Sequence, residues 1–141
     1  MKNDSPLYNS RVLNVYVKLL RSKYPNVNIG EILAYAGLEA YEVNDESCWF
    51  SQFQVNRFYE KSVELTGDGN IARAAGRLAA APETIGALKQ YTFGLMGPSF
   101  AFQLISRLSK RLTRSARYHS RVIKRNQVEI TVEPIEGIEE Q

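Results

Sequence analysis

The chain has very few residues of the kinds that build covalent cross-links or metal centres. It contains one cysteine, Cys48, and one histidine, His119, in 141 residues. A single cysteine forms no internal disulfide and has no second thiolate with which to share a metal ion. His119 has no second histidine and no nearby cysteine, so we expect a structural or solvated side chain and predict no metal site. Cys48 is best explained as a small, partly buried apolar residue.

Long apolar runs are also missing. No run approaches the roughly 20 residues that a membrane-spanning helix needs, and the first ten residues, MKNDSPLYNS, are polar, unlike a signal peptide. We therefore predict a cytoplasmic chain without a membrane span. A length of 141 residues with 44% hydrophobic and 23% charged residues fits one soluble domain with a sizeable core.

The sequence patterns of common catalytic sites are absent. The TGDG stretch, Thr66 to Gly69, lacks the lysine and the spacing of a phosphate-binding loop, and no serine lies in a nucleophile-elbow pattern. Glu60 and Glu64 lie one turn apart on a polar helix face, where solvation explains them better than acid–base work. We expect no enzyme activity and no cofactor from this segment.

Acidic residues are missing between Glu83 and Glu129, although nine Lys and Arg fall in that interval, and the sequence then turns acidic. A basic helix face followed by a basic strand is able to contact the phosphates of nucleic acid or an anionic membrane. No interleaved aromatic residues or recognised DNA-reading motif accompany the charge, so a solvated face is the better explanation and nucleic acid is not the expected partner. Four cations form this predicted basic face: Arg107, Lys110, Arg111 and Arg114.

The stretch from Ser51 to Ala80 carries the local signals of a helix, a tight turn and a second helix. Ser51 can accept a hydrogen bond at the start of the first helix, and Gln54 can reach back to the Ser51 N–H, which makes a capping box. Gly67 suits the left-handed end of that helix, and Asn70 is the expected N-cap of the next. Spacings of three and four residues predict the inward face: Val55, Phe58, Tyr59, Ser62, Val63 and Thr66.

Further helices are predicted on both sides of this stretch. Asn9 or Ser10 begins a helix that runs to about Tyr24, and Asn28 and Gly37 bound a short one. Two more are expected to begin after the central pair, at Pro82 and at Pro98.

The region between the short helix and Ser51 lacks a helical stripe. We predict an extended link over residues Leu38 to Asp45, because Asn44 and Asp45 are typical of a turn. Trp49 and Phe50 then act as a hydrophobic staple that packs back on the following helix.

From Arg117 to Glu133 the apolar period changes from helical to alternating, which predicts a β-hairpin. Arg121 and Lys124 are expected to face Glu129 or Glu133 across it. The predicted fold is therefore α+β: mostly helical, with five to six helices and a C-terminal antiparallel β-hairpin. Because a lone hairpin is marginal in water, it has to pack on the helices or join other strands, and we expect the chain to be a fragment of a larger fold.

Three stretches carry a resemblance to a known family. They are DESCWFSQFQVNRFYEKSVELTGDGNIARAAGRLAAAPETIGALKQYTFGLMGP, LTRSARYHSR (Leu112 to Arg121) and NQVEITVEP (Asn126 to Pro134). Together they resemble the N-terminal sensory module of bacterial hybrid sensor histidine kinases. The layout is also similar to the ligand-binding N-terminal domain of some AraC-type regulators. More distantly, it is similar to haem-NO-binding domains and to small-molecule-binding domains of the vinyl-reductase type.

The resemblance implies a regulatory input domain over residues 1–134, with residues 135–141 as a linker or the start of a next segment. It implies PAS and kinase domains downstream in a two-component phosphorelay, and the rest of the sensor fold beyond Gln141. The haem-binding signature Tyr-x-Ser-x-Arg is met at Tyr118 and Ser120, but Val122 stands where arginine is needed. We therefore expect no haem.

Two functions follow for the chain. The first is a signal-input domain of a histidine kinase that binds a small apolar ligand or transmits its signal as a homodimer. The second is a nucleic-acid-binding or transcription-regulatory module that uses the basic 107–125 face. A ligand pocket, if present, is predicted between the central helices and the hairpin, although core packing is the better explanation for each of its aromatic residues taken singly. The pocket residues are Trp49, Phe58, Tyr59, Tyr91 and Phe93.

Overall fold

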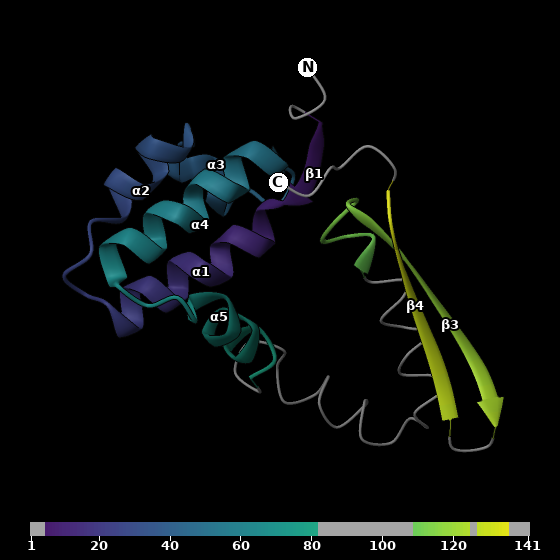
Figure 1. The fold of residues 1–141 in the computed structure, drawn as a ribbon. Helices are drawn as coiled ribbons and strands as arrows, with labels where there is room; N and C mark the ends of the chain where they lie inside the picture. The colour runs from purple at the N-terminus through teal and green to yellow at the C-terminus, as the bar shows by residue number, and fades with distance from the viewer. Residues whose placement is uncertain (1–4, 82–108, 125–126, 136–141) are drawn as a thin grey trace. The chain divides into compact units, whose positions relative to one another are not determined.

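Five helices and two short antiparallel sheets make up the described part of the chain, residues 5–81, 109–124 and 127–135 of the computed structural model (Figure 1). The chain divides into two units, residues 1–81 and 82–141. The predicted α+β class with a C-terminal hairpin is confirmed. The helices predicted to begin at Pro82 and Pro98 lie outside the described residues.

The first two helices begin and end at the predicted signals. Helix α1, Ser10–Lys23, has Asn9 as its N-cap and ends before Pro25. Helix α2, Ile29–Ala36, is capped by the Asn28 side chain and ends at Gly37, whose φ of 68° is left-handed. A residue with a Cβ is strained in that conformation, so glycine suits this helix end.

A small sheet precedes α1 and α4, and sequence reasoning did not predict it. Strand β1, Pro6–Asn9, pairs antiparallel with β2, Trp49–Ser51. Trp49 and Phe50 therefore lie in a strand, and Phe50 is buried. Strands of four and three residues are too short to show an alternating pattern, so only the pairing between distant segments identifies them.

The extended link predicted for Leu38 to Asp45 is wrong. Residues Ala40–Asn44 form helix α3, which begins with a capping box between Glu39 and Glu42. A helix of five residues buries only Val43, and one buried position makes no stripe that a periodicity argument can detect. The capping box is the local signal that identifies it.

The central helix pair forms as predicted, with one correction. Helix α4, Gln52–Thr66, carries the Ser51–Gln54 capping box and ends at the left-handed Gly67. Helix α5, Ile71–Ala79, follows, but the Asn70 side chain makes no capping hydrogen bond. Instead, Asp68 Oδ1 accepts the Asn70 N–H at 2.8 Å. The aspartate two residues earlier thus forms the turn that places α5.

The apolar core of the first unit joins four helices. Leu13 and Leu20 of α1, Ile32 of α2, Phe58 of α4 and Ile71 of α5 are each at most 1% exposed. In Figure 1, α2 and α4 lie side by side, and α5 lies against α1. The predicted inward stripe of α4 is confirmed at its centre, where Phe58 and Ser62 are buried.

Asp68 ties the end of α1 to the turn between α4 and α5. Its Oδ2 atom accepts a hydrogen bond from the Tyr24 hydroxyl and pairs with Lys23 Nζ at 3.3 Å. The hydrogen bond from Tyr24, followed by that from the Asn70 N–H, lowers the pKa of Asp68 below its ordinary 3.8. The folded state therefore favours the ionised carboxylate.

The second unit contains the predicted hairpin. Strand β3, Ala116–Lys124, pairs antiparallel with β4, Gln127–Pro134, with Ser120 opposite Ile130. Arg121 lies opposite Glu129, and their side chains form an ion pair at 3.3 Å, as predicted. Residues that lie opposite each other in the two strands point to the same face of the hairpin. One face therefore carries five apolar side chains: Tyr118, Val122, Val128, Ile130 and Val132.

We predict that Asp68→Asn destabilises the protein in a pH-dependent way. The stability that the lowered pKa confers is fully present above the ordinary pKa and is lost as the pH falls through the folded value. The urea midpoint of the variant should lie below that of the unchanged protein by a constant amount from about pH 7 to pH 5, and the gap should narrow below about pH 4.

A matched control is Glu60→Gln, at an exposed carboxylate of α4 that forms no ion pair within residues 5–81. This control should shift the midpoint little. A difference in urea midpoint between Asp68→Asn and the unchanged protein that widens as the pH falls would contradict the role assigned to Asp68.

Candidate functional site

The structure places the predicted pocket residues of the first unit in different surroundings. Phe58 is 1% exposed and packs edge-to-face on Tyr16, with ring centroids 6.1 Å apart. Tyr59 is half-buried and its hydroxyl donates to Gly69 O at 3.3 Å. Trp49 lies half-buried in β2. Phe58 is therefore part of the core, and Tyr59 holds the α4–α5 turn. Tyr91 and Phe93 lie outside the described residues.

Tyr16 is the partner of Phe58 and carries a buried hydroxyl-bearing ring. Burial, and secondly the neighbouring Tyr59, raise the pKa of Tyr16 above 10.0. The hydroxyl of Tyr16 therefore stays protonated at neutral pH, so Tyr16 supplies packing rather than a base.

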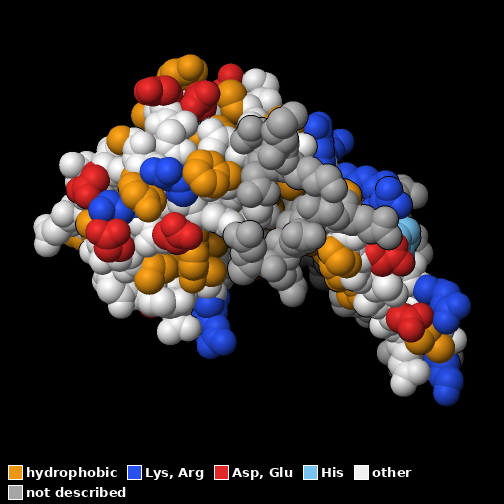
Figure 2. Space-filling view, turned by 45° about the horizontal axis from the view of Figure 1, so that its top comes forward, with side chains coloured by type: hydrophobic (Ala, Val, Ile, Leu, Met, Phe, Trp, Pro, Cys, Tyr) orange, Lys and Arg blue, Asp and Glu red, His pale blue; other side chains and the backbone are white. Residues whose placement is uncertain are grey.

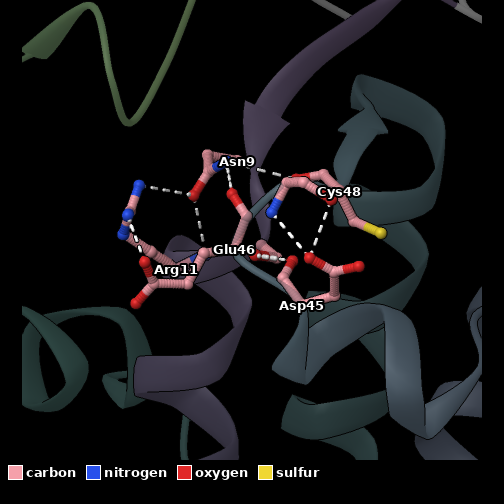
Figure 3. A network of polar contacts seen from close by, with 7 residues as sticks. Asn9, Arg11, Asp45, Glu46 and Cys48 are labelled. Atoms are coloured by element: carbon pink, nitrogen blue, oxygen red, sulfur yellow. Dashed lines mark hydrogen bonds and ion pairs between the residues drawn. The ribbon is translucent and has the colours of Figure 1, made fainter.

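A polar network closes the loop between α3 and β2 (Figure 3). The Asn9 side chain, 1% exposed, donates to Glu46 O at 2.9 Å and to Cys48 O at 3.2 Å. The Ser10 hydroxyl donates to Asp45 O at 2.7 Å, and Arg11 pairs with the Glu46 carboxylate. The two buried groups, Asn9 and Ser10, both satisfy backbone carbonyls, so the network is structural.

Cys48 lies at the edge of this network, and Figure 3 shows its sulfur turned away from Asn9. Burial, and secondly the carboxylates of Asp45 and Glu42, raise the pKa of the Cys48 thiol. A protonated thiol is a poor nucleophile and a poor metal ligand. Within the described residues, no group of three His, Cys, Asp or Glu side chains is placed to hold a metal ion.

An aromatic and cationic cluster lies on the outer side of α2 and α4, and sequence reasoning missed it. The Arg57 guanidinium lies 4.2 Å from the Tyr35 ring centroid and 5.4 Å from that of Phe53. Its Nε also donates to Tyr35 O at 2.6 Å. Tyr35 and Phe53 are nonetheless 41% and 48% exposed. We call Tyr35, Phe53 and Arg57 the α2–α4 cluster.

Lys61 extends the same surface by one turn. It pairs with Glu31 of α2 at 3.0 Å and with Glu64 at 2.7 Å, and these hydrogen bonds, that to Glu64 first, raise its pKa. Arg57, by contrast, forms no ion pair within residues 5–81. The spacing of four residues from Phe53 to Arg57 to Lys61 was the available sequence signal. A rigid cation framed by aromatic rings suits recognition of a carboxylate rather than bond-making chemistry.

The predicted basic helix face is wrong for the residues that the structure describes. Ser109 is the last residue in helical conformation, and residues 110–115 form turns and bends, so Lys110, Arg111 and Arg114 do not share a helix face. Thr113 Oγ1 accepts the Ser115 N–H at 3.1 Å, which offers the backbone an alternative to the helix. Arg107 lies outside the described residues.

The basic strand that follows is partly neutralised by its partner strand. Arg121 pairs with Glu129, and His119 Nε2 lies 3.7 Å from Glu133 Oε2. Figure 2 shows this alternation of basic and acidic side chains along the hairpin, at the lower right. This pairing weakens the attraction of the hairpin for a polyanion.

Comparisons with known proteins do not assign this chain to a family. No protein-family model, curated protein or solved structure matches this chain. Within the described residues, no helix is long and apolar enough to cross a bilayer. The function is therefore argued from the residues themselves.

We predict that Phe58→Ala lowers the free energy of unfolding by about 3–5 kcal/mol, because it leaves a cavity against Tyr16 in the core. Urea denaturation measures this change. The matched variant Tyr59→Phe removes only the hydroxyl that bonds Gly69 O and should cost about 1 kcal/mol or less. Equal, small costs for both variants would instead favour a pocket-lining role for Phe58.

Proposed function

We propose that the chain is the signal-input domain of a bacterial sensor histidine kinase, which binds a small apolar ligand or transmits its signal as a homodimer. The observation that carries the proposal is the two-faced hairpin of the second unit. Val122, Ile130 and Val132 on its apolar face are 45%, 47% and 54% exposed. The opposite face carries the Arg121–Glu129 ion pair.

Half-exposed β-branched side chains on one face of a hairpin provide a surface for a binding partner. A two-stranded hairpin is marginally stable alone, and burying its apolar face stabilises it by about 25 cal/mol for each Å² removed from water. An apolar ligand or a second subunit supplies such burial. The state of the hairpin then depends on what is bound, which is what an input domain requires.

The use of buried polar groups in the first unit also supports a binding role over catalysis. The buried polar side chains are Asn9, Ser10, Ser51 and Ser62. The Ser62 hydroxyl donates to Phe58 O, Ser51 caps α4, and Asn9 and Ser10 close the loop before β2. Each group thus has a structural partner. Downstream PAS and kinase domains of the same chain, implied by the resemblance, are the proposed partners.

Native mass spectrometry of the full chain, purified from cells, tests the proposal directly. We expect either a mass above that of the polypeptide, from a retained ligand, or a dimer. The variant V122T/I130T/V132T keeps β-branched side chains but makes the face polar, so it should lose the ligand or weaken the dimer. His119→Thr, on the opposite face, is the control. A bare monomer at all concentrations would contradict the proposal.

The alternative, a nucleic-acid-binding module that uses the 107–125 region, is tested separately. We expect no saturable binding of a short DNA duplex in a fluorescence titration at low salt, because Glu129 and Glu133 offset the hairpin cations. Binding that weakens steeply with added salt would favour this alternative.

A further inference from the structure

Two elements of the first unit, α1 and the region of α3, each carry charged side chains of a single sign. Residues 5–81 carry as many Lys and Arg as Asp and Glu, yet α1 contains four cations and no acid: Arg11, Lys18, Arg21 and Lys23. From Tyr24 to Asn56 the sequence has no Lys or Arg. Four of the acidic residues in that interval lie in or beside α3: Glu39, Glu42, Asp45 and Glu46.

The cationic and acidic elements are packed together. The Asn14 side chain of α1 donates to Val43 O and to Asn44 Oδ1 of α3, both at 3.2 Å. Arg11 and Glu46 already form an ion pair between them. Arg11, Lys18 and Arg21 lie three, four and seven residues from Asn14 and so share its side of α1, whereas Lys23 pairs with Asp68 instead. This row of three cations lies beside the acids in and next to α3, and we call the two rows together the α1–α3 surface.

Several of these charges already have a partner within the first unit: Arg11 and Glu46 pair with each other, Lys23 pairs with Asp68, Glu39 and Glu42 form the capping box of α3, and Asp45 accepts from Ser47. Lys18, Arg21 and Glu39 are exposed and form no ion pair within residues 5–81. Tyr41 on α3 is 70% exposed, which places a large aromatic side chain at the surface of the acidic element. Tyrosine is enriched at protein interfaces, where charges from two partners surround an aromatic anchor.

We infer that the α1–α3 surface binds a second copy of the chain about a two-fold axis. A two-fold operation places α1 of each copy against α3 of the other, so that every cation row meets an acid row, and the assembly closes as a dimer. A nucleic acid would meet the acidic row next to the cationic one, so the sorted charges favour a copy of the same surface over a polyanion.

The inference rests on the dimerisation arm of the proposed function and adds to it a contact surface on the first unit, separate from the apolar face of the hairpin. Lys18 and Arg21 of one copy face Glu39 and Glu42 of the other, with the two Tyr41 side chains between them. Like charges meet in any arrangement that sets α1 against α1, so the complementary register is the one preferred.

Sedimentation equilibrium of the full chain tests the surface with charge-reversed variants. K18E/R21E should raise the Kd of the dimer about tenfold or more, and so should E39K/E42K. An equimolar mixture of the two variants should recover a heterodimer, because the reversed rows complement each other. R73E/R77E, which makes the same change in net charge on α5, is the matched control and should leave the Kd unchanged.

E39K/E42K reverses two charges and also removes the capping box of α3. A second pair of variants separates these two effects. E39Q/E42Q keeps the side-chain acceptors of the capping box and removes only the charge, and Tyr41→Ala removes the aromatic anchor. Both should raise the Kd, and far-UV circular dichroism should show unchanged helix content. An unchanged Kd in K18E/R21E, an equal rise in R73E/R77E, or a mixture that stays monomeric would overturn the inference.

The outcomes separate this inference from the proposed function. A ligand-bound monomer, or a dimer that tolerates K18E/R21E, overturns the α1–α3 surface and leaves the input-domain proposal standing. A bare monomer overturns both.

Discussion

The first unit depends on one buried amide, the side chain of Asn9. Its Oδ1 atom accepts the Arg11 N–H and so caps α1, while its Nδ2 atom donates to the carbonyls of Glu46 and Cys48. One side chain thus ends β1, begins α1 and holds the segment that leads into β2 and α4. Without these hydrogen bonds, the amide of Asn9 and the carbonyls of Glu46 and Cys48 would be left unsatisfied, which is costly away from water. This junction therefore fixes the start of α1 against the segment that enters β2.

Apolar, polar and charged side chains have different roles in the helical unit. The core takes Phe58 and its aliphatic neighbours, and the buried polar groups are used to join elements. Charged side chains lie outside, and on two elements they are of one sign: α1 is wholly basic and the α3 region is acidic. Mixed charges would pair within the unit and leave little for a partner. Sorted charges leave complementary rows, and these rows are the basis of the proposed self-association.

Binding in this chain is proposed to use surfaces rather than a catalytic centre. The α2–α4 cluster holds Arg57 between two rings, and the hairpin holds its apolar residues on one face. Of the predicted pocket residues, Phe58 is a core residue, and its place in the core followed from the helical stripe. The surface of Tyr35, Phe53 and Arg57 did not follow, because its members come from two helices whose alignment no local pattern specifies.

The amino-acid sequence by itself determined α1, α2, α4, the presence of the hairpin and the left-handed ends at Gly37 and Gly67. The signals for these features, caps and periodicity, act within a few residues of the chain. Only the tertiary structure decided the pairing of β1 with β2, the helix at Ala40–Asn44, the use of Asp68 in place of Asn70, and the end of helical conformation at Ser109. The strand pairing and the role of Asp68 depend on contacts between residues about 40 positions apart, such as Tyr24 with Asp68 and Asn9 with Cys48. The helix Ala40–Asn44 and the end of helical conformation at Ser109 are set by side-chain hydrogen bonds to the nearby backbone. The periodicity of apolar residues carries no information about these bonds or about the distant contacts.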